Sequence, residues 1–144
     1  MESGIPERIE LRVVTPAGEL LRQPVDELIA PGEEGYFGVR PGHTPLLASL
    51  GLGELSYRSG SSWERLTCFS GFCEVLPDRV TILADVGERP GEIDVARAEA
   101  SKAAALEKMK TSVRESEHAE AHAEYERALT RLSVARSRRG PAGS

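Results

Sequence analysis

The stretch ERPGEIDVARAEA, residues 88–100, divides the sequence into two parts with different residue patterns. Before it, short alternating apolar segments are separated by turn residues, whereas after it neither glycine nor proline occurs before Gly140. Both residues interrupt helices, so their absence from so long a segment is typical of helical structure. We therefore predict two structural units, residues 1–88 and residues 89–144, with a hinge at ERPGE (88–92).

The first unit has the pattern of antiparallel strands joined by short turns. In RIELRVVT (8–15), Ile9, Leu11 and Val13 alternate with charged residues, which is the period of a strand with one solvated face. Similar segments follow at GELSYRS (53–59), WERLTCF (63–69), GFCEVLP (71–77) and RVTILAD (79–85). Many short strands at regular spacing favour a sandwich or a barrel. We predict an antiparallel β-sandwich over residues 1–88.

The second unit contains two helical segments, DVARAEASKAAALEKMK (94–110) and SEHAEAHAEYERALTRLSVARSRR (116–139), with a polar break near residues 111–117. Asp94 is expected to cap the first helix, because its carboxylate can accept hydrogen bonds from the free N–H groups of the first turn. The simplest arrangement of two helices joined by so short a break is an antiparallel hairpin. We predict this hairpin after the sandwich.

The apolar faces of the two predicted helices are narrow and rich in alanine. The residues at helical spacing are Leu106, Met109 and Val113 in the first helix and Ala121, Tyr125, Ala128, Leu132 and Ala135 in the second. Burying one methyl group contributes only ~0.8 kcal/mol, much less than burying a leucine side chain. We therefore expect a weakly closed hairpin that can open without unfolding the sandwich.

Composition argues against several classes of protein. The net charge of −5 and the pI near 5.3 argue against a nucleic-acid partner, since such proteins neutralise phosphates with clustered Lys and Arg. The first residues lack the features of a signal peptide, and no apolar run approaches the ~20 residues needed to span a bilayer. We expect neither export nor direct bilayer insertion. Cys68 and Cys73 are interpreted as buried thiols instead of a disulfide.

The sequence carries no motif that predicts catalysis. It has no GxxxxGK[ST] motif, and its three lysines all fall in the helical unit, so no autonomous ATPase is expected. His118 and His122 stand four residues apart and could share a zinc ion, but no third ligand is evident, and solvated histidines are the alternative. His43 is interpreted as a hydrogen-bonded loop residue, because no nucleophile motif accompanies it.

The segment GYFGVRPGHTPLL (35–47) places apolar side chains between glycines and prolines. One interpretation is an Ω-like loop whose Phe37 and Leu46 fill the sandwich core. The other is a rigid loop with exposed apolar groups, fixed by Pro41 and Pro45, which would lose little entropy on binding a partner. The residue pattern alone leaves both open.

Three stretches follow one another in the order and separation of a known family: GYFGVRPGHTPLLASLGLGEL (35–55), SGFCEVLPDRVTILAD (70–85) and IDVARAEA (93–100). The chain closely resembles the epsilon subunit of the F-type ATP synthase, the counterpart of the mitochondrial delta subunit. The resemblance runs from about Ile9 to Arg136. It implies a non-catalytic rotor subunit with an N-terminal sandwich and a C-terminal helical hairpin, at the cytoplasmic face of the bacterial inner membrane. The resemblance also implies that the subunit requires no cofactor.

The resemblance also implies that the sandwich docks on the γ subunit and on the c-ring. The residues that match the docking loop are Gly35, Tyr36, Phe37, Gly38, Pro41, Gly42 and His43. Relatives often have an acidic residue at position 36, so the tyrosine in this chain is compatible with an apolar contact there instead of an ionic one.

In some bacterial relatives an IDxxRA-type motif helps to bind regulatory ATP, which is sensed and not hydrolysed. The matching residues here are Glu88, Ile93, Asp94, Arg97, Ala98, Arg127 and Arg131. A helix N-terminus with several guanidinium groups suits a polyphosphate. However, Ala104 replaces an arginine expected seven residues after Arg97. The alternative is that Asp94 is only an N-cap and that Arg97 is a surface residue.

The positive charge of the chain is concentrated late. Up to Glu88 there are 7 Lys and Arg against 14 Asp and Glu, and afterwards 11 against 9. The late arginines are Arg127, Arg131, Arg136, Arg138 and Arg139. The resemblance implies that a hairpin extended along γ presents them to acidic segments of the catalytic α and β subunits and blocks rotation, whereas the folded hairpin permits ATP hydrolysis. For the last three, the alternative is a favourable interaction with the helix dipole.

Two other functions are kept as alternatives. One is an unrelated small metal-dependent enzyme with a site at His118 and His122, for which stoichiometric zinc in the purified protein would be the sign. The other is a free ATP-binding sensor, which nucleotide would stabilise thermally without any partner.

Overall fold

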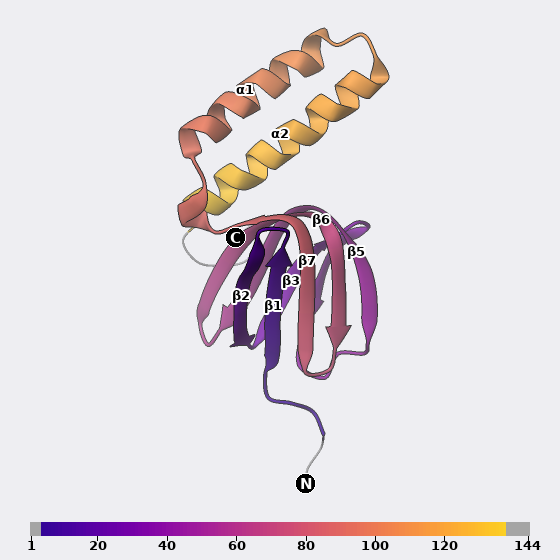
Figure 1. The fold of residues 1–144 in the computed structure, drawn as a ribbon, viewed down its shortest axis with the longest axis vertical. Helices are drawn as coiled ribbons and strands as arrows, with labels where there is room; N and C mark the ends of the chain where they lie inside the picture. Colours follow the sequence, from indigo (N-terminus) through magenta and orange to yellow (C-terminus); the bar gives the residue numbers. More distant parts are fainter. Residues whose placement is uncertain (1–3, 138–144) are drawn as a thin grey trace.

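The computed structural model describes residues 4–137. Its strands are β1 (Ile9–Thr15), β2 (Gly18–Val25), β3 (Glu27–Gly32), β4 (Gly35–Val39), β5 (Leu46–Ser59), β6 (Ser62–Leu76) and β7 (Arg79–Glu88). They are followed by the short 3₁₀ helix η1 (Pro90–Glu92) and by α1 (Val95–Thr111) and α2 (Glu115–Arg136). The predicted order of a β unit followed by two helices is confirmed (Figure 1).

The seven strands form one sheet, in the order β2-β1-β7-β6-β5-β3-β4, which folds over on itself as the predicted sandwich. Side chains from both ends of this order, Val25 of β2 and Val39 of β4, pack in a single core cluster. Within residues 4–137 all strand pairings are antiparallel except one, since β1 runs parallel to β7. A parallel pair needs a long connection, which the intervening strands supply here. Residue alternation does not encode strand direction, so the sequence could not reveal this departure.

The segments expected at 63–69 and 71–77 are parts of one long strand, β6, which bends in the middle. Leu66 and Cys68 face the core before the bend, and Cys73 and Val75 face it afterwards, so the inward-facing set changes parity. A Cβ on Gly71 would lie 1.9 Å from the carbonyl oxygen of Leu83, and the φ angle of Gly71 is 123°. Glycine therefore allows the strand to bend and to take part in both layers.

The core of the sandwich consists of large apolar side chains and two thiols. Its fully buried members with the largest volumes include Ile9, Leu11, Leu28, Leu55, Leu66 and Ile82. Cys68 and Cys73 are free and buried, as predicted, and burial raises the pKa of each thiol to about 12.

The two helices pack antiparallel along an alanine seam, which confirms the predicted hairpin. The buried residues of the two helices are Ala98 and Ala105 of α1 and Ala121, Ala128, Leu132 and Val134 of α2. Leu106 and Val113 are 37% and 95% exposed, so their expected place in the seam was wrong. Leu106 follows Ala105 and so points about 100° away from it, while Val113 lies beyond the end of α1.

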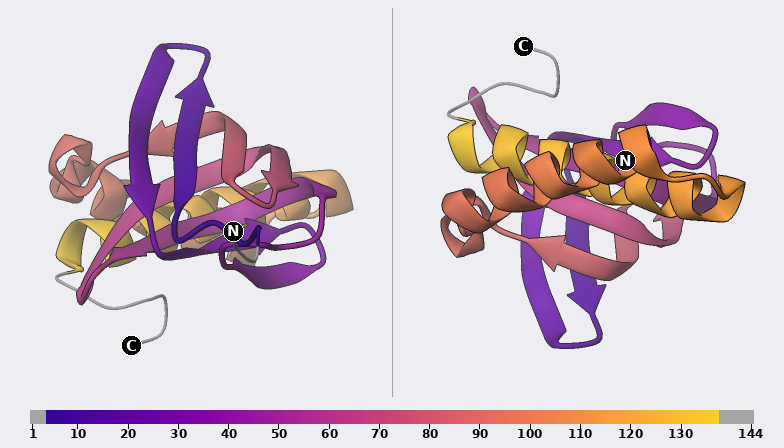
Figure 2. Two further views of the ribbon diagram at one scale, coloured as in Figure 1. Left: turned by 90° about the horizontal axis from the view of Figure 1, so that it is seen from below. Right: turned by 90° about the horizontal axis from the view of Figure 1, so that it is seen from above.

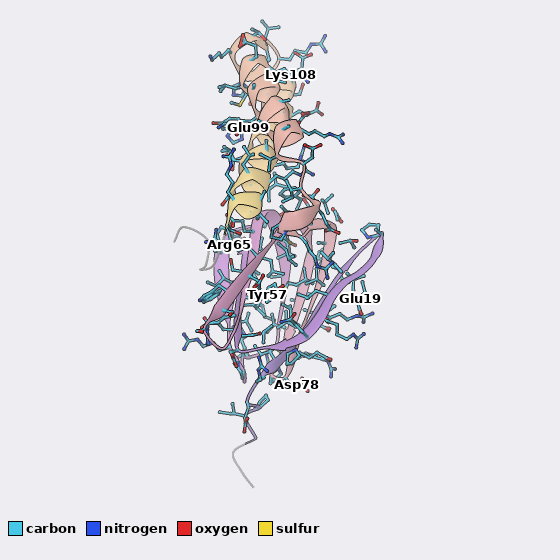
Figure 3. All side chains as sticks on the ribbon, turned by 90° about the vertical axis from the view of Figure 1, so that its left-hand side faces the viewer. Glu19, Tyr57, Arg65, Asp78, Glu99 and Lys108 are labelled. Carbon is cyan, nitrogen blue, oxygen red and sulfur yellow. The ribbon has the colours of Figure 1, made fainter. Side chains whose placement is uncertain are left out.

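The hairpin projects from one end of the sandwich (Figure 1). Lys108 lies near its far tip, whereas Asp78 lies at the opposite end of the sandwich (Figure 3). The helices lie side by side in the view from above in Figure 2, and α2 contacts β5 and β6. The buried residues of the last turns of α2, Leu132 and Val134, lie near this contact.

Candidate functional site

The predicted docking segment is a strand followed by a loop. Gly35–Val39 forms β4, which pairs with β3 and lies at one edge of the sheet. The expectation that the whole of residues 35–47 lies outside regular structure was therefore wrong. Tyr36 and Phe37 are good strand formers, and the prolines that suggested a loop come only after β4 has ended.

Tyr36 presents an exposed ring from a fixed position. The side chain is 52% exposed, and its hydroxyl oxygen accepts a hydrogen bond of 3.1 Å from the backbone N–H of Glu54. Gly53 makes room for this contact, because a Cβ there would lie 2.5 Å from the Tyr36 oxygen. Burial of the phenol end raises the pKa of Tyr36. The tyrosine is thus a neutral, anchored side chain with an apolar face turned to solvent.

The rest of the segment divides between core packing and exposure. Phe37 packs against the core, as one interpretation expected, but Leu46 is 39% exposed and does not fill the core. Gly42 has a φ angle of 84°, and the His43 ring nitrogen Nδ1 lies 2.6 Å from the carbonyl oxygen of Thr44, so His43 is a hydrogen-bonded loop residue. A hollow of about 500 Å³ adjoins this segment. Its lining residues include Glu27, Ile29, Tyr36, Gly38 and His43.

An apolar patch on the outer face of the sandwich was not predicted from the sequence. It consists of Leu47 (73% exposed), Phe72 (56%) and Leu83 (51%), on three neighbouring strands, and is called the outer patch below. Phe72 pairs directly with Leu83, and Leu47 is diagonal to Phe72 on the same face. The available signal was that apolar residues are adjacent in Phe72-Cys73 and Ile82-Leu83, because a half-solvated strand should alternate.

A second site lies where β7 passes into α1. A pocket of about 290 Å³ brings together most of the residues matched to the nucleotide motif. Its lining residues are Glu88, Glu92, Ile93, Asp94, Arg97, Ala98, Ser101 and Arg131. Arg127 is not among the lining residues within the described part of the chain. We refer to this site as the hinge pocket.

Three charged groups of the hinge pocket, Glu88, Asp94 and Arg131, already have partners within the chain. Arg131 Nε lies 2.9 Å from Glu88 Oε1, and its guanidinium lies 5.1 Å from the centre of the Phe69 ring. Thr67 also donates a hydrogen bond of 3.0 Å to Glu88 Oε1. The Asp94 carboxylate accepts from the N–H of Arg97 at 3.1 Å, so its predicted role as N-cap is confirmed. This capping bond is compatible with a ligand at the same helix terminus.

The late arginines do not share one environment. Arg131 belongs to the hinge pocket, whereas Arg136 forms an ion pair with Glu99 and so joins α2 to α1. Arg127 is half-buried on α2. Arg138 and Arg139 lie outside the described residues, so the structure places three of the five.

The histidines of α2 are arranged as ordinary helix residues. Both His118 and His122 are exposed, and His118 Nδ1 lies 3.2 Å from the carbonyl oxygen of Met109. Within residues 4–137, no three His, Cys, Asp or Glu side chains are grouped as a metal site would require. Over the same residues, no helix is long and apolar enough to cross a membrane.

The contact between α2 and the sandwich contains functional candidates that sequence reasoning missed. Glu54 and Arg65 form an ion pair of 3.3 Å, with only 11% and 8% of their side chains exposed. Ser133 Oγ donates a hydrogen bond of 2.9 Å to the other carboxylate oxygen of Glu54. Nothing in the local pattern marks these residues, because charged residues on the outer face of a strand are normally solvated.

Comparison with known proteins accounts for both units. Residues 8–90 match the sequence profile of the ATP synthase, Delta/Epsilon chain, beta-sandwich domain, and residues 92–136 match that of the long alpha-helix domain of the same chain. The chain belongs to the ATP synthase delta/epsilon family. The expected resemblance is thereby confirmed over nearly the whole described length.

Individual relatives of the delta/epsilon family extend this result. The ATP synthase epsilon chain of Syntrophobacter fumaroxidans is 45% identical over 129 residues, which cover 90% of this chain and 96% of the relative. The ATP synthase epsilon chain 2 of Syntrophotalea carbinolica is 42% identical over 90% of this chain and 94% of its own length. The fold is also similar to a chain of the Euglena gracilis mitochondrial ATP synthase, with a TM-score of 0.79 and 22% identity over 90% of this chain and 82% of the other.

Proposed function

We propose that this chain is a non-catalytic rotor subunit of an F-type ATP synthase, which joins the γ subunit to the c-ring and regulates ATP hydrolysis through its hairpin. Membership of the delta/epsilon family supports the assignment to the complex. A chain of similar fold occurs in the Tetrahymena thermophila structure described as central stalk and c-ring, with a TM-score of 0.59. We place the chain at the cytoplasmic face of a bacterial inner membrane.

The observation that carries the docking role is the exposure of apolar side chains on a rigid sheet. The outer patch and the ring of Tyr36 are held by strands, so their burial by a partner would order few new groups. We assign Tyr36 and the loop up to His43 to the c-ring contact and the outer patch to γ.

A charge placed in the outer patch tests the γ contact. Phe72→Glu should reduce co-purification of γ at least about ten-fold, because a buried unpaired carboxylate costs more than 1.4 kcal/mol. Val113→Glu is the matched control, since Val113 is an exposed apolar residue at the hairpin tip, 95% exposed. Equal recovery of γ with both variants would contradict the assignment of this surface.

The proposed regulation is supported by the limited contact between the hairpin and the sandwich. The hairpin residues are absent from the sandwich core cluster, so removing them leaves that core intact. Truncation after Glu88 should therefore raise the ATPase activity of the assembled complex and preserve coupling. Unchanged hydrolysis by a complex containing the truncated chain would refute the inhibitory role of the hairpin.

We further propose ATP as the regulatory ligand of the hinge pocket. Arg97, Arg131 and the N-terminus of α1 converge there, which is chemistry suited to a polyphosphate. Titration calorimetry with ATP should detect binding to the isolated chain, and Arg97→Ala should weaken it. Lys102→Ala is the control, because Lys102 also lies on α1 but does not line the pocket. Identical heats for ATP and buffer would exclude this ligand.

A further inference from the structure

The hairpin meets the sandwich over a buried ion pair as well as over apolar side chains, among them Phe69, whose ring lies under the guanidinium of Arg131. In the β5–β6 ladder Glu54 pairs with Thr67 and Ser56 with Arg65, so Glu54 and Arg65 are diagonal neighbours on the same face. This face is opposite to that of Leu55 and Leu66, which belong to the core cluster. The ion pair is buried even though it lies on the outer side of the sandwich.

Helix α2 completes the hydrogen bonding of this ion pair. Glu54 Oε1 contacts Arg65, whereas Glu54 Oε2 accepts the bond from Ser133, 79 residues further along the chain. Two residues earlier on α2, Arg131 contacts Glu88 at the end of β7. The last turns of α2 thus place two polar side chains on two carboxylates of the sandwich.

A buried ion pair gives little net stability, because removing both charges from water nearly offsets their attraction. When α2 leaves, Glu54 and Arg65 can regain water, and this solvation offsets part of the lost contact. An apolar interface of the same extent would hold the hairpin more firmly. The polar part of the contact therefore favours docking that is specific in position and readily reversible.

We propose that Glu54, oriented by Arg65, is the positioning residue that receives α2, and that its bond from Ser133 and the Arg131–Glu88 ion pair hold the hairpin docked without any nucleotide. The carboxylate fixes where the helix sits, because only one register of α2 brings Ser133 to Glu54 and Arg131 to Glu88 together. This inference concerns the isolated chain and does not depend on assembly with γ or the c-ring.

Single-molecule energy transfer in the isolated full-length chain tests the proposal. Dyes on Val113→Cys, at the hairpin tip, and Asp78→Cys, at the far end of the sandwich, report the docked and undocked populations. The native thiols are buried, with pKa values of about 12, so they should label slowly. We expect a docked majority without nucleotide. If most molecules were docked only after ATP is added, the proposal would be overturned. The same result would still agree with the proposal that ATP binds the hinge pocket.

The decisive variant is Ser133→Ala, which removes the bond to Glu54 from an exposed position on α2 and should not impair folding. It should raise the undocked-to-docked ratio about ten-fold, as expected for losing a hydrogen bond to a charged group. Glu99→Gln is the matched control, because it breaks the exposed Arg136 ion pair between the helices; the ratio should change less than about three-fold. An unchanged ratio in Ser133→Ala, with helicity intact, would overturn the proposal.

A double-mutant cycle connects Ser133 to Glu54 specifically. If both act through one contact, Glu54→Gln combined with Ser133→Ala should undock the hairpin less than the product of the single effects. Independent, multiplicative effects would show that Ser133 does not act through Glu54 and would overturn its positioning role.

Discussion

The sandwich and the hairpin are stabilised by different kinds of side chain. The sandwich buries large branched residues, such as Leu11, Leu55 and Ile82, each 0% exposed, whereas the hairpin seam buries alanines such as Ala105 and Ala121. Because stabilisation scales with the apolar area buried, the sandwich should be a stable platform and the hairpin a marginal pair of helices. The difference shows how one chain can combine a fixed docking surface with a movable element.

The largest loss of stability should come from filling the bend in β6. Gly71→Ala would place a methyl group 1.9 Å from the carbonyl oxygen of Leu83 and would force a side chain into a φ angle of 123°. We expect a loss of more than about 4 kcal/mol or failure to fold. Urea unfolding measures this loss in the free energy of unfolding. Gly91→Ala is the control and should be nearly neutral, because no atom lies within 4 Å of the new methyl group. Equal losses of stability in the two variants would contradict the role of Gly71 in the bend.

A cavity in the sandwich core should have the next largest effect. Ile82→Ala should lower the free energy of unfolding by about 2–5 kcal/mol, because the side chain is fully buried. Leu106→Ala, at a 37% exposed position on α1, is the control and should cost far less. A similar loss at both positions would mean that the two regions are stabilised in the same way.

Loss of the helix cap should weaken only the hairpin. Asp94→Ala removes the acceptor for the N–H of Arg97 and should cost about 1 kcal/mol, whereas Asp94→Asn keeps a capping side chain. Hydrogen exchange can separate the regions, since amides of α1 should exchange faster while those of β5 and β6 do not change. Faster exchange throughout the sandwich would show that the two units unfold together.

The smallest effect is expected at the surface ion pair between the helices. Glu99→Gln should lower stability by roughly 0.2–1 kcal/mol, because both side chains of the Glu99–Arg136 pair are about half exposed. The melting temperature measured at low and high salt tests this value. A loss as large as that of Ile82→Ala would show that charge, and not the alanine seam, closes the hairpin.

The sequence allowed the order of the elements to be predicted, but not the contacts between distant residues. Alternation in RIELRVVT and the absence of glycine and proline after the hinge reflect local geometry, which is why the strands and helices could be predicted. The parallel pairing of β1 with β7 depends on the whole topology. The prediction for Leu106 and Val113 was wrong because it assumed that apolar residues of the first helix face the second helix.

The candidate sites could be predicted in part, for the same physical reason. The residues of the hinge pocket were expected from the resemblance to the family, and most of the matching motif, including Ile93, Asp94 and Arg97, is close together in sequence. The outer patch and the contact of Glu54 with α2 could not be predicted, because each is formed by residues from strands or helices that are distant in sequence. Arg131 was matched to phosphate binding, yet the structure pairs it with Glu88, 43 residues away.

The position of the hairpin gives it a mechanical property. Helix α2 has 22 residues and is therefore about 33 Å long, and it contacts the sandwich near one end. A tilt of roughly 10° at that end would carry the opposite end about 6 Å, given the helical rise of 1.5 Å per residue. The paired helices therefore act as a lever, which converts a small rearrangement around Glu54 into a large displacement at Lys108.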